Sequence, residues 1–174
     1  MNVESANVDP DATAALDWSR AAAQLDELRP AGGRGPTCWL ATTRPDGRPH
    51  LTGIVGHWFD DTFYFVSGPG TRKARNLADD GRCAVAISLG DLDLVLEGTA
   101  RRVGDHAVVE RIAVRFSERG WPLAVEGDLL SAPFRAPTAP PAPWHLYALA
   151  PERALGVATA GDPGATPWTF AAGD

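Results

Sequence analysis

The feature that most constrains the fold is a run of short apolar segments separated by turn residues between positions 37 and 67. Residues 37–43 (TCWLATT), 49–59 (PHLTGIVGHWF) and 62–67 (TFYFVS) are rich in β-branched and aromatic residues, which predicts three strands. Pro45-Asp46-Gly47 and Asp60-Asp61 are residues typical of tight turns. Strands joined by such short turns predict an antiparallel meander.

Helices are expected to interrupt and follow this meander. Three N-cap residues, Asp17, Thr71 and Asp105, predict helices over 18–28, over 71–79 and from 105 to about Arg119. Apolar patterning predicts further strands over 82–89, 93–103, 144–149 and 153–158, and the Pro/Ala-rich stretch 129–143 predicts an irregular loop. Because no alternating βαβ pattern is present, the sequence predicts an α+β fold built on an antiparallel barrel with flanking helices.

The first residues differ in character from the rest of the chain. Residues 1–16 are polar and Ala-rich without apolar periodicity, so we expect a flexible N-terminal tail whose removal leaves the fold intact. Residues 17–174 are expected to form one cofactor-binding domain.

Charge and composition exclude several classes of partner. The net charge of −6 and the pI of about 5.1 argue against broad binding to nucleic acid or to an anionic membrane. No signal peptide and no apolar run of roughly 20 residues is visible, so a cytoplasmic protein is expected. Cys38 and Cys83 lie in apolar runs without metal-ligand spacing, which predicts reduced, buried thiols and no metal site.

The segment that carries chemistry runs from Ser67 to Leu77, SGPGTRKARNL. It places two glycines, a hydroxyl and three basic residues where a strand gives way to a helix. A helix N-terminus offers unpaired N–H groups and a positive dipole end, and glycine lets a ligand approach the backbone. These parts predict a phosphate site. Taken alone, the same residues also fit a solvated basic helix.

The order of these segments resembles the pyridoxamine 5′-phosphate oxidase-like family, the split β-barrel proteins that bind flavin or deazaflavin. The most specific pieces are RKARNL (72–77) and EGTA (97–100), and the resemblance covers residues 36–103 well and 144–170 more loosely. It implies an FMN-binding split barrel-like fold and a homodimer with the cofactor across its interface. It also implies that the start of the basic helix holds the cofactor phosphate and that the second strand contacts the ring.

Carried over residue by residue, the resemblance assigns the cofactor site. Thr71, Arg72 and Lys73 would hold the phosphate, with Asn76 hydrogen-bonding nearby and Ser67 adding a hydroxyl. Five consecutive residues would line the ring: Arg48, Pro49, His50, Leu51 and Thr52. The chain departs from the family at residues 166–170 (TPWTF), where two arginines of a common closing motif are absent.

The function implied is a cofactor-dependent oxidoreductase that transfers hydride to a small organic substrate. Coenzyme F-420 is preferred over FMN; the alternatives are an FMN-dependent oxidoreductase and a non-catalytic flavin- or haem-binding protein. No catalytic side chain is assigned, although His50 or water could protonate the substrate. The odd spacing of His50 and His57 predicts opposite faces of one strand. Trp144 is a candidate to stack on the ring, and the loop 129–143 is expected to shape the substrate pocket.

Overall fold

The computed structural model describes residues 3–10, 14–28, 36–133 and 142–171, which form three helices and eleven antiparallel strands. The helices are α1 (Trp18–Asp26), α2 (Arg72–Asp79) and α3 (His106–Glu118). The strands are β1 (Val3–Ser5), β2 (Cys38–Thr43), β3 (Pro49–Ile54), β4 (Gly56–Phe59), β5 (Thr62–Ser67), β6 (Arg82–Ser88), β7 (Leu92–Arg102), β8 (Ala124–Glu126), β9 (Leu129–Ser131), β10 (Trp144–Ala158) and β11 (Ala165–Phe170).

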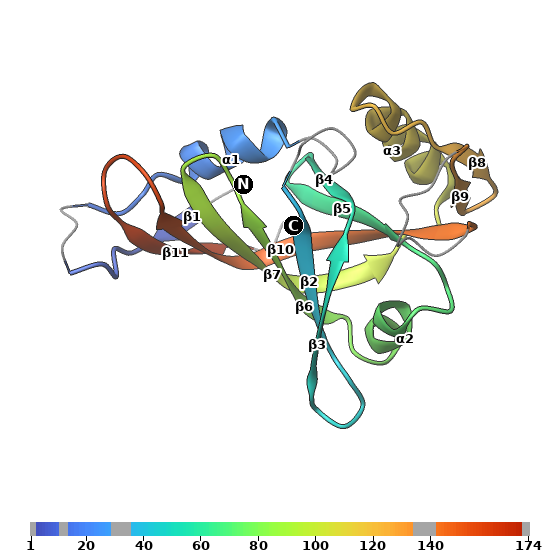
Figure 1. The fold of residues 1–174 in the computed structure, drawn as a ribbon, viewed down its shortest axis with the longest axis horizontal. Coiled ribbons are helices and arrows are strands. Elements are labelled where there is room, and N and C mark those ends of the chain that lie inside the picture. The colour runs from blue at the N-terminus through green and yellow to red at the C-terminus, as the bar shows by residue number, and fades with distance from the viewer. Residues whose placement is uncertain (1–2, 11–13, 29–35, 134–141, 172–174) are drawn as a thin grey trace.

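One sheet runs in the order β1-β11-β10-β7-β6-β2-β3, and β10 connects it to the remaining strands (Figure 1). The first part of β10 pairs with β5 and β9 as well as with β7; β4 extends β5, and β8 extends β9. The sheet does not close, so the architecture is an antiparallel split barrel, as predicted. Figure 1 shows α1 and α3 along one side of the long sheet, and α2 beside the projecting β2–β3 hairpin.

The local signals for helix starts and turns are confirmed. Asp17, Thr71 and Asp105 each accept a backbone N–H bond at the start of their helix. Asp60 and Asp61 form the two-residue turn between β4 and β5 with φ of 49° and 56°, the left-handed conformation that a tight hairpin of matching twist requires.

Two predicted strand boundaries are wrong. The single strand expected over 49–59 breaks at Val55, so β3 pairs with β2 whereas β4 pairs with β5. The two strands expected over 144–149 and 153–158 are one strand, β10, which passes through Pro151 because the register with β7 shifts between Pro151 and Arg153. A bulge of this kind tolerates a residue that has no N–H to donate.

The predicted irregular loop over 129–143 is also partly wrong. Its first three residues form β9, which pairs with β8 and with the start of β10. Ala142 and Pro143 carry no regular structure, and residues 134–141 lie outside the described part of the chain. The proposal that this loop shapes a substrate pocket is therefore not tested.

Gly98, in the EGTA motif, lies on β7 directly opposite Pro151 of β10. A Cβ atom at this position would stand 2.5 Å from the carbonyl oxygen of Ala150 and 3.2 Å from the backbone nitrogen of Glu152. Both contacts are with backbone, which cannot rotate away as a side chain can. The glycine in the motif thus serves the packing of two central strands.

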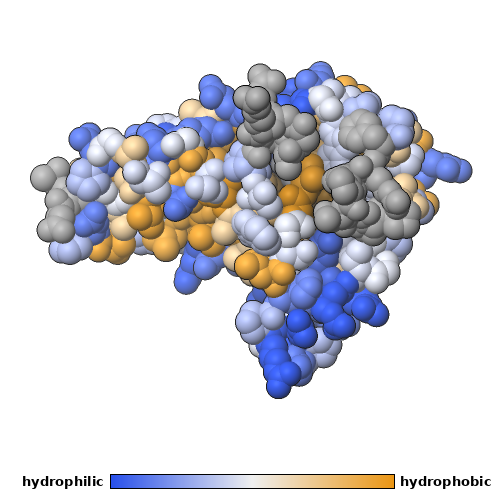
Figure 2. Space-filling view, viewed as in Figure 1, coloured by the Kyte–Doolittle hydropathy of each residue, from blue (hydrophilic) through white to orange (hydrophobic). Residues whose placement is uncertain are grey.

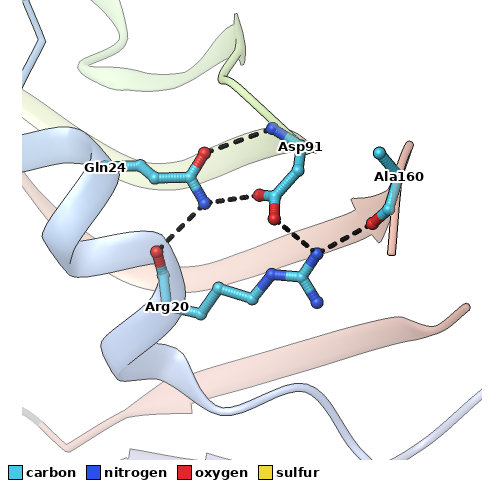
Figure 3. A network of polar contacts seen from close by, with 4 residues as sticks. All are labelled: Arg20, Gln24, Asp91 and Ala160. Carbon is cyan, nitrogen blue, oxygen red and sulfur yellow. Dashed lines mark hydrogen bonds and ion pairs between the residues drawn. The ribbon is translucent and has the colours of Figure 1, made fainter. Parts of the chain in front are cut away.

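A polar network fastens α1 to two turns of the sheet (Figure 3). Arg20 donates to Asp91 Oδ2 at 2.8 Å and to the carbonyl of Ala160 at 3.0 Å, and Gln24 donates to Asp91 Oδ1 at 2.7 Å. These bonds lower the pKa of Asp91, the hydrogen bond from Arg20 being the largest cause. Asp91 is therefore a structural carboxylate that joins the β6–β7 turn to α1.

The N-terminal segment differs from the flexible tail that was expected. Val3–Ser5 forms β1 and pairs with Phe170, Thr169 and Trp168 of β11, and Val8 N–H bonds the carbonyl of Ala165. Leu16 is buried, and its carbonyl accepts a bond of 3.2 Å from Trp168 Nε1. The prediction of a loose tail is wrong for these residues, because pairing between the two ends of a chain leaves no local signal.

Deleting residues 1–8 should therefore lower the melting temperature. The deletion removes β1 and the backbone hydrogen bonds to β11, and a loss of about 1–3 kcal/mol corresponds to a fall of about 3–10 °C in a chain of this size. Calorimetry of the truncated protein measures this, with deletion of residues 1–2 alone as the control that keeps β1. An unchanged melting temperature would support the tail as first predicted.

Candidate functional site

The start of α2 is organised by hydroxyl groups. Thr71 caps the helix: its Oγ1 accepts from Ala74 N at 3.3 Å and donates to the carbonyl of Gly68 at 2.9 Å. Ser67 Oγ lies 2.8 Å from Thr71 Oγ1. Either hydroxyl can donate in this bond, because Ser67 Oγ also lies 3.4 Å from the carbonyl oxygen of Gly68. Ser67 is buried, so its hydroxyl holds the cap in place.

Four basic side chains gather around this helix start. Arg72 and Lys73 are in the first turn of α2, Arg44 follows β2, and His50 lies on β3. The pKa of His50 is lowered, first by desolvation and then by the charges of Arg44, Arg72 and Lys73. Burial also lowers the pKa of Lys73, which is half-buried. Within the described residues, no carboxylate forms an ion pair with any of these four.

Arg44 is a site residue that the sequence reasoning missed. Its Nε is buried and has no hydrogen-bond partner among the described residues. A buried guanidinium N–H without an acceptor is costly, and a bound anion would supply that acceptor. The feature that could have revealed Arg44 is the register of the β2–β3 hairpin. Thr42 lies opposite His50, and the N–H of Arg44 donates to the carbonyl of Arg48. Because alternate residues of a strand face the same side, Arg44 lies on the same side of the hairpin as Thr42.

A hydrogen-bond chain links α2 to the histidine. Asn76 is buried and donates from Nδ2 to Thr42 Oγ1 at 2.9 Å, and Thr42 Oγ1 lies 3.5 Å from His50 Nδ1. Because Thr42 accepts from Asn76, its own hydrogen is available for Nδ1. A Thr42 hydroxyl that donates to Nδ1 in this way corresponds to the neutral His50 tautomer with its proton on Nε2.

The five residues predicted to line the ring do not share one face. His50 and Thr52 are half-buried, whereas Pro49 and Leu51 are exposed on the opposite face of β3, and Leu51 is 61% exposed. Arg48 is exposed in the turn, where its Nη1 lies 3.8 Å from Asp46 Oδ2. The structure thus brings His50 and Thr52 to the face that α2 covers, and leaves Leu51 on the other side of the ribbon.

Two further candidates lie away from this cluster. His57 is fully buried, stacked near Phe59 and edge-on to Phe116. It lies on β4 and His50 lies on β3, so the prediction that both share one strand is wrong. Trp144, the residue expected to stack on a ring, is buried with its ring centroid 5.9 Å from that of Trp121. That interpretation of Trp144 is wrong, because strand β10 carries the side chain into a core cluster.

The two thiols are largely buried, and burial changes how easily they ionise. Burial raises the pKa of Cys38 to about 12 and that of Cys83 to about 11, so both stay protonated and unreactive at neutral pH. Over the described ranges, no three His, Cys, Asp or Glu side chains are grouped so that they could hold a metal ion. None of the helices described is long and apolar enough to cross a membrane.

The described residues thus bring together a helix N-terminus, a half-buried lysine, two arginines and a histidine, and no carboxylate among them forms an ion pair with this group, so it is a candidate anion site. Figure 2 shows hydrophilic surface gathered where α2 and the β2–β3 hairpin lie, next to apolar surface along the long sheet. A group such as a phosphate would meet bidentate and point-charge donors there. The fold defines a split-barrel protein, and the basic group at the start of α2 is its candidate ligand site.

Comparison with known proteins identifies the family. The family model for pyridoxamine 5′-phosphate oxidase matches residues 24–135, which include β2 to β9, α2 and α3. The chain belongs to this family. No curated protein matches the sequence.

Solved structures with the same fold are distant in sequence. A pyridoxamine 5′-phosphate oxidase-related, FMN-binding protein from Nostoc punctiforme is 17% identical with a TM-score of 0.54, covering 84% of each chain. General Stress Protein 26 from Bacillus anthracis is 14% identical with a TM-score of 0.53, covering 81% of this chain and 94% of its own. At these identities the likeness establishes the split-barrel fold and nothing about the ligand.

Proposed function

We propose that this protein binds a flavin-type cofactor through its phosphate at the start of α2 and acts as an oxidoreductase on a small organic substrate. The observation that supports this most directly is the buried Nε of Arg44, which has no hydrogen-bond partner among the described residues, in a side chain whose charge acts on His50 together with those of Arg72 and Lys73. The family membership supports it independently. When bound, the cofactor supplies hydride transfer, and the protein supplies binding and orientation.

Each residue of the candidate site would have its own role in binding the cofactor. Arg44, Arg72 and Lys73 would bind the phosphate, and the free N–H groups at the helix start would add to its field. Ser67 and Asn76 would act indirectly, Ser67 by fixing the Thr71 cap and Asn76 by orienting Thr42. His50 and Thr52 would face the ring, and His50 would hold a proton at Nε2 next to it. Arg48, Pro49 and Leu51 would contact the ring through backbone or across the dimer.

Coenzyme F-420 is the cofactor we propose first, since the GPGTRKARNL form of the phosphate segment resembles the deazaflavin branch of the family. FMN is the second candidate, because the distantly similar Nostoc protein is an FMN-binding protein. Titration of the purified protein with each cofactor, followed by competition between them, decides the choice. Saturable quenching of F-420 fluorescence that FMN does not reverse is the expected result. Failure of both to bind, or a Soret band with haem instead, would overturn the proposal.

We further propose that a second copy of the chain covers the outer face of the sheet. Trp39, Ala86, Val95 and Leu155 stand directly opposite one another on β2, β6, β7 and β10, and so form one apolar row. Trp39 and Leu155 remain 46% and 41% exposed, and the row lines a groove of about 620 Å³. Its self-complementary apolar character suits a two-fold interface, which in obligate dimers buries more than about 2,000 Å².

The dimer is tested by mass in solution. The parent protein should have the mass of a dimer by light scattering at micromolar concentration, and Trp39→Asp should shift it to a monomer because a carboxylate is costly in an apolar interface. Val114→Asp is the matched control: this residue is 58% exposed on α3, outside the row. A monomeric parent, or an unchanged dimer in Trp39→Asp, would contradict the assignment of this face.

A further inference from the structure

A second basic cavity lies on the other side of α2 from the phosphate site. It has a volume of about 670 Å³, is open to solvent, and is bordered by α2, the end of β7 and the start of β10. Its walls include Arg75 and Ala78 from α2, Arg101 and Arg102 from β7, and His145 and Tyr147 from β10. At 100° per residue, Ala74 and Ala78 point away from the side of the helix that carries Lys73 and Asn76.

The side chains that give this cavity its charge are basic. Three arginines and one histidine line it, and no carboxylate of the described residues does. Arg102 is held by Asp128 in the β8–β9 turn, but Arg75 and Arg101 form no ion pair within the described ranges. In a chain with 22 acidic and 16 basic residues, cations gathered without a carboxylate indicate that an anion from outside completes the site.

The remaining wall is apolar. Ala74, Leu77 and Ala100 contribute buried aliphatic surface, and the ring of Tyr147 is fixed by stacking on Phe65 with centroids 5.2 Å apart. Burial raises the pKa of Tyr147, so its hydroxyl stays protonated and can donate a hydrogen bond. A ligand for this cavity would therefore combine an anionic group with an apolar body.

We propose that the cavity between α2, β7 and β10 binds a small aromatic or aliphatic carboxylate, with Arg75 and Arg101 holding the carboxylate and the Leu77–Tyr147 wall holding its apolar part. The planar guanidinium fork matches a carboxylate in a bidentate manner. None of the three side chains proposed to bind the phosphate, Arg44, Arg72 and Lys73, lines this cavity, and the proposal does not depend on the cofactor proposed above.

The test uses ¹⁹F NMR of 4-(trifluoromethyl)benzoate with the purified full chain, and 4-(trifluoromethyl)benzyl alcohol as the neutral counterpart. The carboxylate should show saturable binding that the alcohol lacks. Arg75→Gln with Arg101→Gln should weaken it by at least about tenfold, since each charge-assisted contact is worth a factor of about ten. Arg111→Gln, an exposed arginine on α3, and Lys73→Ala should leave it unchanged.

Several results would overturn the proposal. Absence of saturable carboxylate binding at millimolar concentration would do so, as would equal binding of the alcohol. Loss of binding in Lys73→Ala, with the arginine variants unaffected, would place the anion at the phosphate site instead. Circular dichroism and melting temperature of the arginine variants confirm that the fold is intact, and both residues are exposed, so a folding failure is not expected.

Discussion

Lys73→Ala is expected to weaken binding of F-420 by about 10- to 150-fold while the apo protein stays folded. Lys73 is half-buried in the first turn of α2, where burial lowers its pKa and the helix dipole disfavours a cation. It forms no ion pair within the described residues. A lysine kept in such a position indicates a ligand whose negative charge offsets this cost. Loss of one charge-assisted contact of about 1.5–3 kcal/mol gives the stated range.

Control variants distinguish loss of the contact between Lys73 and the phosphate from a general change in the charge of the protein. Lys73→Arg should retain part of the affinity, because the charge remains but its geometry changes. Arg111→Ala removes the same charge from an exposed position on α3 and should leave the affinity unchanged. Arg44→Gln should weaken binding as well, because it removes the buried Nε donor. If Lys73→Ala binds both F-420 and FMN as tightly as the parent, the phosphate site lies elsewhere, and the proposed function loses its main physical support.

The parts of this structure that depend on neighbouring residues could be predicted from the sequence. The cap at Thr71, the glycines before it and the basic first turn are contiguous, so the start of α2 and its basic character followed directly. The Asp60-Asp61 turn was visible for the same reason. These local signals were sufficient to locate the helix half of the candidate site.

The parts that depend on residues far apart in the chain were not visible. The pairing of β1 with β11 joins residues from opposite parts of the sequence. The two strands expected over 144–149 and 153–158 are one, because a bulge lets β10 continue past Pro151. Arg44 was not singled out in the sequence, because only the hairpin register and the approach of α2 bring its charge, with that of Lys73, to act on His50. Consecutive numbering also concealed that Leu51 and His50 face opposite sides of β3.

Because His57 is buried, we expect the folded protein to lose much of its stability in mild acid. The side chain is fully buried between Phe59 and Phe116, and burial is the largest cause that lowers its pKa from 6.5 to about 4. The hydrogen bond to the Leu28 carbonyl opposes this shift, and the charge of Arg119 adds to it. Between pH 6.5 and 4 the unfolded chain binds the proton and the native protein does not, so stability falls as the pH falls. The loss attributable to this group is about 2–3 kcal/mol between pH 7 and pH 4.

His57→Phe should flatten this dependence and leave stability at pH 7 nearly unchanged. Phenylalanine keeps the ring packing and removes a buried Nε2 that has no hydrogen-bond partner in the described part of the chain. The Leu28 carbonyl keeps an acceptor bond from Arg119 Nη1 at 3.1 Å, so it is not left unsatisfied. Urea unfolding from pH 7 to 4 measures the difference, with exposed His106→Gln as the control that should track the parent. Parallel curves for the parent and His57→Phe would mean that His57 takes up its proton equally in the folded and unfolded protein, and would contradict this prediction.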